Sequence, residues 1–541
     1  MAKVSTYLFL LLSISFVLSA IVDEVDVSSP DASKAFEAKF KSGLFSNLKD
    51  DANDSFDMCE RRINPSEPNY FYFFPNFKAK LFKEGDVMTF KAGCFQNNTV
   101  TLTKLTQKET IITLHSEKPK NLFCSDVYDV HTANINHLTS VFFKGDHKIK
   151  LKNLSTDDMD EIKVNGIKLL GFCSGMIETM KSLFMTLGAF VGGLGYDPHA
   201  KIPIFRPHIP EYMVKHNLAM LQFYNHWQPL PRNDTVVDID ENEIHTGDFV
   251  AVSRLDGIDP MIMMGIGSTI GHSAVCAWID GKLYVLESQD GFYWPYHGVQ
   301  KTPFKEWVQL AHNAEFNVAI LPMREDIRAK FDTEKAVSWF LNGIEGLPYG
   351  YHNFLFGWID TVDSNMPFAI THGHFEFLFT VLEKISKDTA TLMMGEAFNM
   401  RIGTRNLTLA QATAEAARQG YTFEEVVAMP EGDDWEYSNG KNYVCACFVA
   451  RFYKAGGLFD GYDILANEFT PKDVVQLDFF DKDYKDKRPQ ACKDADPDLP
   501  YCQIMGKWQV PIFGYSTIPL YDHMNEKCPS LAPDFYRPSD C

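Results

Sequence analysis

Hydrophobic residues recur at every second position in the N-terminal part of the chain. Apolar and polar residues alternate over Val87–His115, and Asn97-Asn98 lies near the middle of this stretch. A period of two is typical of an antiparallel hairpin, and an Asn-Asn pair suits its turn. Similar short runs cover Leu122–Val130 and Val141–Leu151. We therefore predict a small, mainly β domain over residues 21–190.

A proline-rich segment separates this domain from the rest of the chain. Residues 191–235 contain the sequences IPIFRPHIPEY and HWQPLPRND. Proline lacks a backbone N–H and interrupts regular elements. The segment is therefore predicted to be an irregular connector without long helices or strands.

The pattern changes after the connector. Four runs have the composition and length of strands: Asp248–Val252, His272–Trp278, Lys282–Glu287 and Phe316–Leu321. Helical spacing of apolar residues follows in Thr333–Leu341, Phe375–Ile385 and Leu409–Ala417. We predict one α+β domain over residues 236–541, with a helical insertion at about 360–435.

The first twenty residues have the features of a cleaved signal peptide. Lys3 precedes the apolar run Tyr7–Leu18, and small residues follow at Ser19-Ala20. This run is shorter than the ~20 apolar residues that span a bilayer. Five N-glycosylation sequons begin at Asn53, Asn97, Asn153, Asn233 and Asn406. The expected location is secreted, or the lysosomal or endosomal lumen.

Charge limits the partners of the protein. The net charge is -20 and the sequence pI is about 5.2. A chain this acidic is not expected to bind nucleic acid or an anionic membrane surface. Charged residues interrupt every later apolar run, so we expect no integral membrane association.

The chain has eleven cysteines, an odd number for a protein of an oxidising compartment. Eight are disulfide candidates in two groups: Cys59, Cys94, Cys124 and Cys173 in the N-terminal domain, and Cys492, Cys502, Cys528 and Cys541 in a tail at about 485–541. Sequence does not give their connectivity. Cys276, Cys445 and Cys447 remain, and at least one thiol lacks a partner within the chain. An unpaired thiol in this setting favours a catalytic explanation.

Cys445 is the best candidate nucleophile. It opens a predicted helix with an apolar face that includes Phe448 and Phe452, and Gly456-Gly457 ends this helix. Unsatisfied N–H groups and the helix dipole favour a thiolate in the first turn. The alternative is that Cys445 and Cys447 are small buried hydrophobic residues, or that one of them forms a disulfide.

His272 and Glu287 form a candidate base and orienting group. His272 begins one predicted strand and Glu287 ends the next, and Asp280-Gly281 makes a tight turn between them. The hairpin brings the imidazole and the carboxylate together. The imidazole then serves as base to a thiol, and the carboxylate fixes its tautomer. A histidine with a structural role is the alternative.

These segments occur in one order that resembles a known superfamily, the circularly permuted NlpC-like papain-fold enzymes, which include the lecithin-retinol-acyltransferase-like enzymes. The matching segments are Gly247-Asp248, Gly271-His272-Ser-Ala-Val275, Glu287 and Cys445-Ala-Cys-Phe-Val449. The strands precede the cysteine helix, which is the permuted order, and the Phe-Val pair selects Cys445 over Cys447. Gly346-Leu-Pro-Tyr349-Gly350 resembles a further segment of the family. The resemblance covers about residues 240–460, and it implies substrate-binding positions at Asp248, Tyr349 and Tyr443.

Two departures from the family pattern stand out. The helical insertion is larger than expected, and Cys447 occupies a position where a polar residue is common. No metal is expected, because no ligand completes a site with His372 and His374. No cofactor is expected either, since the sequence has no Walker or Rossmann motif.

The resemblance implies a permuted papain-like catalytic domain preceded by the mainly β domain. The predicted activity is that of a thiol hydrolase that cleaves an amide in a peptide or peptidoglycan-like substrate. N–H groups at the start of the Cys445 helix are expected to bind the oxyanion. Two alternatives stay open. One is an enzyme acting on acyl substrates, as an ester or thioester hydrolase or an acyltransferase, and the other is a non-catalytic secreted binding glycoprotein.

Overall fold

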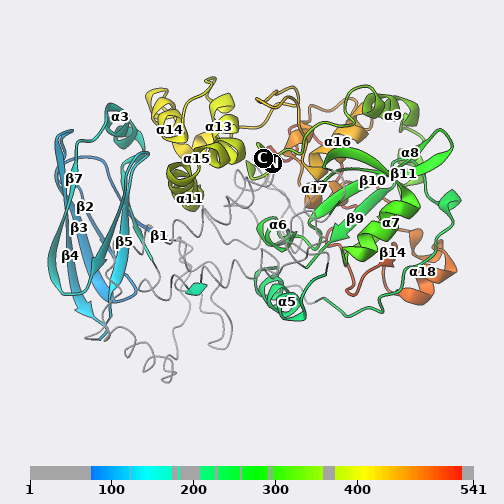
Figure 1. Ribbon diagram of the computed structural model, residues 1–541, viewed down its shortest axis with the longest axis horizontal. Helices are drawn as coiled ribbons and strands as arrows, with labels where there is room; N and C mark the ends of the chain where they lie inside the picture. Colours follow the sequence, from blue (N-terminus) through cyan, green and yellow to red (C-terminus); the bar gives the residue numbers. More distant parts are fainter. Residues whose placement is uncertain are drawn as a thin grey trace. The chain divides into compact units, whose positions relative to one another are not determined.

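The computed structural model describes residues 75–526, except 122–123, 173–178, 180, 183–207, 226–228, 256–258, 290–293, 295–296 and 357–371 (Figure 1). The predicted signal peptide, Asn53 and four of the cysteines lie outside the described residues: Cys59, Cys173, Cys528 and Cys541. The chain divides into two compact units. The first comprises Met1–Thr186, Gly373–Gly395 and Asn406–Phe423, and the second comprises Leu187–His372, Glu396–Arg405 and Glu424–Cys541.

The N-terminal unit contains two antiparallel sheets of four strands each. One has the order β1-β8-β5-β6 and the other the order β2-β3-β4-β7. Their strands are β1 (Asn76–Leu81), β2 (Val87–Phe90), β3 (Phe95–Lys104), β4 (Glu109–Pro119), β5 (Asp126–His131), β6 (Asn136–Val141), β7 (Gly145–Lys152) and β8 (Ile167–Gly171). Alternate residues of both sheets share one apolar core that includes Leu114, Tyr128 and Leu169. The period-two pattern thus reflects strands with one face in this core.

The predicted turn at Asn97-Asn98 is wrong. Both residues lie inside β3, opposite Glu117 and Ser116 of β4. The Asn98 side chain is buried, donates to the Phe95 carbonyl and accepts from the Ser116 hydroxyl. These hydrogen bonds satisfy a polar side chain within a strand, and the turn falls between Lys104 and Glu109 instead.

The pattern predicted one helical insertion in the C-terminal domain. The helical segments beyond residue 372 do not form such an insertion. Residues 373–395 and 406–423 belong to the N-terminal unit. The helices of this unit are α3 (Thr156–Asn165), α11 (His372–Ile385), α12 (Lys387–Ala390), the π-helix η3 (Thr391–Gly395) and α14 (Leu409–Arg418). Arg418 of α14 pairs with Asp157 of α3, and Glu376 of α11 pairs with the buried Lys168 of β8. These contacts join helices and sheet across more than 200 residues of sequence, which local periodicity does not reveal.

The C-terminal unit is built on one six-stranded antiparallel sheet with the order β12-β11-β10-β9-β13-β14. Its strands are β9 (Phe249–Ser253), β10 (His272–Ile279), β11 (Lys282–Gln289), β12 (Gly298–Pro303), β13 (Asn317–Leu321) and β14 (Cys502–Met505). The four strands predicted from sequence correspond to β9, β10, β11 and β13. The combination of antiparallel sheets and helices makes the fold α+β.

Helices cover both faces of this sheet. Val275 and Ala277 of β10 pack in a core with α9 (Thr333–Leu341), α16 (Cys445–Ala455) and α17 (Pro471–Gln476). Ala274 and Cys276 face a second core with Trp307 of α7 (Phe304–Asn313). Figure 1 shows the sheet between α16 and α7. Short helices complete the described chain: η1 (Glu241–Glu243), α8 (Glu325–Arg328), α13 (Glu396–Arg401), α15 (Phe423–Val427), η4 (Ala466–Glu468), η5 (Tyr484–Asp486) and α18 (Gln490–Ala495).

The connector contains a long helix, which the prediction of an irregular segment missed. The helix α5 (Glu211–Asn225) has no proline in its fifteen residues, because the prolines of the connector flank it. Asn217 donates to the Leu255 carbonyl, and Asn225 donates to the carbonyls of Met263 and Ser268. These bonds attach α5 to α6 (Asp259–Gly265).

Two disulfides lie within the predicted groups. Cys94 pairs with Cys124 in the N-terminal unit, and Cys492 pairs with Cys502 in the C-terminal unit. Disulfides of this kind are typical of an extracellular or lumenal compartment. Four predicted glycosylation residues are exposed, as a glycan requires: Asn97, Asn153, Asn233 and Asn406. Among the described residues, no helix has the length and apolar character needed to cross a membrane.

Candidate active site

The segment that leads into α16 sets the position of Cys445. Tyr443 forms a parallel bridge with Tyr349, and its carbonyl accepts from the Gly350 N–H at 2.9 Å. A Cβ atom on Gly350 would lie 2.5 Å from the Val444 nitrogen, so only glycine fits this close approach. The Gly346–Gly350 segment noted in the sequence thus lies directly against the start of the cysteine helix.

The first turn of α16 presents its backbone N–H groups without a side-chain cap. Val444 is the N-cap residue and has no side-chain acceptor. The first intrahelical bond runs from the Phe448 N–H to the Val444 carbonyl. The N–H groups of the preceding three residues therefore have no acceptor within the helix, and they add to its positive end. An apolar cap leaves this positive end free to stabilise a thiolate or an oxyanion.

His272 lies between Cys445 and Glu287. Ala274 pairs with Glu287 across β10 and β11, and His272 lies two residues before Ala274 on the same strand face. The His272 Nε2 and Glu287 Oε2 atoms are 2.8 Å apart, and the ring lies close enough to Cys445 for that side chain to raise the pKa of His272. Since Nε2 is engaged by Glu287, Nδ1 is the nitrogen that remains for the thiol. The three predicted catalytic side chains are therefore in contact in one row.

Trp307 completes this row, although no sequence pattern singles it out. Its indole N–H donates to Glu287 Oε1 at 2.9 Å, and both side chains are fully buried. Each Glu287 oxygen thus faces a donor, one from α7 and one from His272. A buried tryptophan N–H needs an acceptor. The position of Trp307 in the sequence does not reveal that this acceptor is Glu287.

The His272 ring is favoured in its protonated form. Burial acts to lower the pKa of His272, and the hydrogen bonds and charges of Cys445 and Glu287 act to raise it. The partners outweigh burial, and the pKa of His272 lies well above its ordinary value. A proton on the ring is the state that pairs with a thiolate at Cys445.

The other two free thiols of the described residues, Cys447 and Cys276, have different surroundings. The Cys447 thiol donates to the Asn467 carbonyl at 3.1 Å, and burial, followed by the charge of Glu431, raises its pKa well above the ordinary value. Burial and the charge of Asp248 raise the pKa of Cys276 in the same way. Both thiols are held in the neutral form, which is a poor nucleophile.

Two of the three predicted substrate-binding residues do not line the cavity at Cys445. Asp248 is buried and accepts from the backbone N–H groups of His245 and Met323 and from the Arg328 guanidinium. It therefore fixes the start of β9. Tyr443 is buried too, and its carbonyl accepts from the Ser288 hydroxyl. Only Tyr349 lines the cavity.

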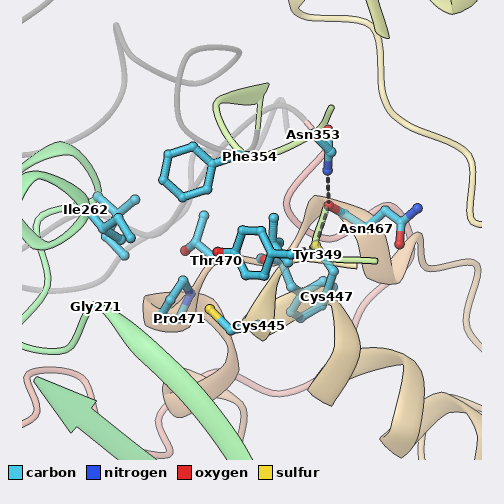
Figure 2. A pocket seen from close by; sticks show the side chains of 13 residues that line it. Ile262, Gly271, Tyr349, Asn353, Phe354, Cys445, Cys447, Asn467, Thr470 and Pro471 are labelled. Atoms are coloured by element: carbon cyan, nitrogen blue, oxygen red, sulfur yellow. Dashed lines mark hydrogen bonds between the residues drawn. The ribbon is translucent and has the colours of Figure 1, made fainter. Parts of the chain in front are cut away.

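A small cavity of about 40 Å³ opens beside the Cys445 thiol. Figure 2 shows the sulfur of Cys445 at its edge, with Ile262 and Phe354 farther along the wall. Apolar residues dominate the lining: Ile262, Ile266, Phe354, Val444, Phe469 and Pro471. Within the part of the chain that the structure describes, no group of three or more His, Cys, Asp or Glu residues could hold a metal ion.

No family model, no curated protein and no solved structure matches this chain. The geometry around Cys445 is therefore the main ground on which a function can be proposed.

Proposed function

We propose that this protein is a cysteine-nucleophile hydrolase with a permuted papain-like catalytic domain, and that it cleaves an amide bond. The observation that carries the proposal is the row of contacts from Cys445 through His272 to Glu287. The order of elements supports it as well. Strands β9, β10 and β11 precede the cysteine helix α16, as in the permuted arrangement that the sequence resembles.

The row of side chains suits a two-step acyl transfer. In the first step Cys445 Sγ bonds to the amide carbon, its proton having passed to His272. His272 then gives this proton to the leaving nitrogen as the C–N bond breaks. In the second step water attacks the thioester, and His272 takes a proton from the water. The C–S bond breaks, and the proton returns to the thiol. The products are a carboxylic acid and an amine, and no other reactant is needed.

The remaining parts have defined roles in this mechanism. N–H groups in the first turn of α16 stabilise the oxyanion of each tetrahedral intermediate, because the apolar Val444 cap does not occupy them. Glu287 keeps His272 in the tautomer that presents Nδ1 to the thiol. Trp307 is a positioning residue, since it contacts Glu287 and not the reacting atoms.

A non-catalytic binding protein would not need this arrangement. A buried carboxylate is costly unless it is paired and hydrogen-bonded, and an apolar side chain could fill the same space without that cost. Here the carboxylate is directed at a histidine that in turn contacts a thiol. Acyl esters and thioesters remain alternative substrates, because the same groups would cleave them.

Alkylation of the native protein tests the proposal. Iodoacetamide at neutral pH should label Cys445 first, and peptide mapping identifies the labelled residue. Cys445→Ser should abolish hydrolysis without loss of folding. Cys447→Ser is the matched control, since that thiol contacts the Asn467 carbonyl and not His272. Preferential labelling of Cys447, or hydrolysis that survives Cys445→Ser, would refute the assignment of the nucleophile.

A further inference from the structure

We infer that the cavity beside Cys445 binds the acyl side of the substrate, and that it selects a short branched aliphatic group about the size of a leucine side chain. This inference rests on the proposed function, because it takes Cys445 as the nucleophile. It adds the substrate class, which the row of catalytic side chains does not specify.

The position of the cavity assigns it to the acyl side. Cys445 lines the cavity, whereas His272 does not and only its neighbour Gly271 does. The leaving amine must take a proton from His272, so it has to lie near the imidazole. The acyl part stays bonded to Cys445 Sγ through the thioester. A cavity that borders the sulfur and not the imidazole ring therefore accommodates the part that remains attached.

The lining makes the cavity apolar. Its polar side chains use their donors within the protein: Asn353 Nδ2 donates to the Asn467 carbonyl, Asn467 Nδ2 to Glu431, and Thr470 Oγ1 to Asp473. Among the described residues, no lysine, arginine or carboxylate side chain lines the wall. A carboxylate or other anionic substrate group would lose its hydration here without a compensating donor, so the cavity disfavours it.

The volume limits the length of the group. A single water needs about 10–15 Å³ of such space. A cavity of about 40 Å³ therefore holds about three to four groups the size of water or a methylene. An isobutyl group has four carbons and fits this limit, whereas a phenyl ring or a long lipid chain would have to extend beyond the cavity.

Ile262 is the residue best suited to test this size limit. It comes from α6, is only partly buried, and forms the wall on the side away from Cys447 of α16 (Figure 2). A change at this position alters the space in the cavity and leaves the contacts of Cys445 with His272 in place. Ile262 is therefore a specificity residue and not part of the catalytic row.

Acylation by p-nitrophenyl esters measures the preference directly, because release of p-nitrophenolate does not depend on the natural leaving group. The esters are acetate, 4-methylpentanoate, 3-phenylpropanoate, decanoate and the monoester of succinate, each corrected for its hydrolysis by hydroxide. On the full-length protein we expect 4-methylpentanoate to react at least about tenfold faster than acetate. The phenyl, decanoyl and succinyl esters should react more slowly than 4-methylpentanoate.

Variants locate the preference in the cavity. Ile262→Phe fills the space, so the ratio of the 4-methylpentanoate rate to the acetate rate should fall about tenfold. Ile262→Ala enlarges the space and should move the optimum to 3-phenylpropanoate. Leu230→Phe adds the same bulk at an exposed residue outside the cavity and should change neither rate. The circular dichroism spectrum and melting temperature of each variant show whether it is folded.

The outcomes separate this inference from the proposed function. If Cys445→Ser still releases p-nitrophenolate at the original rate, the nucleophile itself is wrong. If Cys445 is acylated but the ester series is flat, or decanoate is preferred, the hydrolase stands and the aliphatic cavity is refuted. A preference for 4-methylpentanoate that Ile262→Phe leaves unchanged would also refute the assignment of the cavity.

Discussion

Replacement of Glu287 by glutamine tests the catalytic row at its buried end. Glu287 has two donors around it, the Nε2–H of His272 and the Nε1–H of Trp307, and one carboxylate oxygen faces each. Glutamine has the same shape but only one oxygen. Whichever way the amide turns, its NH₂ group faces one of the two donors. Glu287→Gln therefore leaves a buried donor without an acceptor and removes the negative charge beside His272.

The size of the effect follows from these two losses. A buried polar group that loses its hydrogen bond costs about 1–3 kcal/mol. If the donor left without an acceptor is that of His272, the imidazole is held less firmly toward Cys445. The transition state then loses this amount of stabilisation. Since about 1.4 kcal/mol corresponds to a factor of ten in rate, hydrolysis should fall about ten- to a hundredfold. If the donor is that of Trp307, the free energy of unfolding should drop by the same amount.

The pH dependence gives a sharper readout than the rate alone. Hydrogen bonds and charges of Cys445 and Glu287 hold the pKa of His272 well above its ordinary value, against the effect of burial. Without the carboxylate, the pKa of His272 should fall, and less of the imidazolium–thiolate pair should form at pH 6. Alkylation of Cys445 by iodoacetamide at pH 6 should then slow about tenfold or more. At strongly alkaline pH, where a thiol ionises without help, the two proteins should react alike.

The stability curve has a defined sign. A histidine with a raised pKa in the folded state contributes stability that is fully present below its unfolded pKa of about 6.5. This contribution is lost as the pH rises through the folded pKa of His272. Glu287→Gln should therefore reduce stability most at and below neutral pH. Glu345→Gln is the matched control, because this partly exposed carboxylate pairs with Lys301 at the surface and should cost at most about 1 kcal/mol. A pH profile of alkylation that is identical in wild type and Glu287→Gln would refute the role of Glu287.

Three further predictions address other parts of the chain. Loss of the Cys94–Cys124 disulfide, which closes a loop of 30 residues, should lower the free energy of unfolding by about 3.6 kcal/mol. Loss of Cys492–Cys502, which closes 10 residues, should lower it by about 2.7 kcal/mol. Calorimetry of the two Cys→Ser variants measures this order. Gly350→Ala should slow alkylation of Cys445 markedly, because its Cβ would displace the backbone that leads into α16, and mass spectrometry of the labelled peptide shows this. Burial raises the pKa of Asp129 to about 7, so its protonation should stabilise the N-terminal unit as the pH falls through 7. The melting temperature should rise from pH 8 to pH 6.5, and this rise should be smaller in Asp129→Asn than in wild type. An equal rise in the two proteins would contradict the prediction.

Local pattern predicted the elements that surround the candidate site. Thr333–Leu341 is a helix with the predicted bounds, and the cysteine helix begins at Cys445 and ends before Gly456, as capping and glycine signals indicated. The predicted strand pair appears as β10 and β11, so the contact between His272 and Glu287 follows from a tight hairpin. These features depend on short spacings along the chain, which explains why a single sequence was sufficient to predict them.

Longer-range features were not predictable in the same way. Trp307 reaches Glu287 only because α7 packs on the sheet face opposite α16, and no sequence period encodes that pairing. Asp248 was expected to meet substrate, but two donors from a distant segment, the Met323 N–H and the Arg328 guanidinium, hold it at the start of β9. The helices of residues 373–395 and 406–423 were assigned to the wrong unit for the same reason. In each case the decisive contact joins residues that are remote in sequence.

Burial of ionisable groups alone does not identify the site. The N-terminal unit also buries an ion pair, Lys168 with Glu376, and among the described residues no free thiol belongs to this unit. Such a pair costs desolvation and is weak evidence for any role beyond folding. His272 and Glu287 pay the same cost, yet their hydrogen bonds lead to Cys445, at the start of a helix and at the edge of an apolar cavity. A requirement of folding explains none of these three coincidences, whereas acyl transfer requires each of them: a base, an oxyanion site and space for the acyl group.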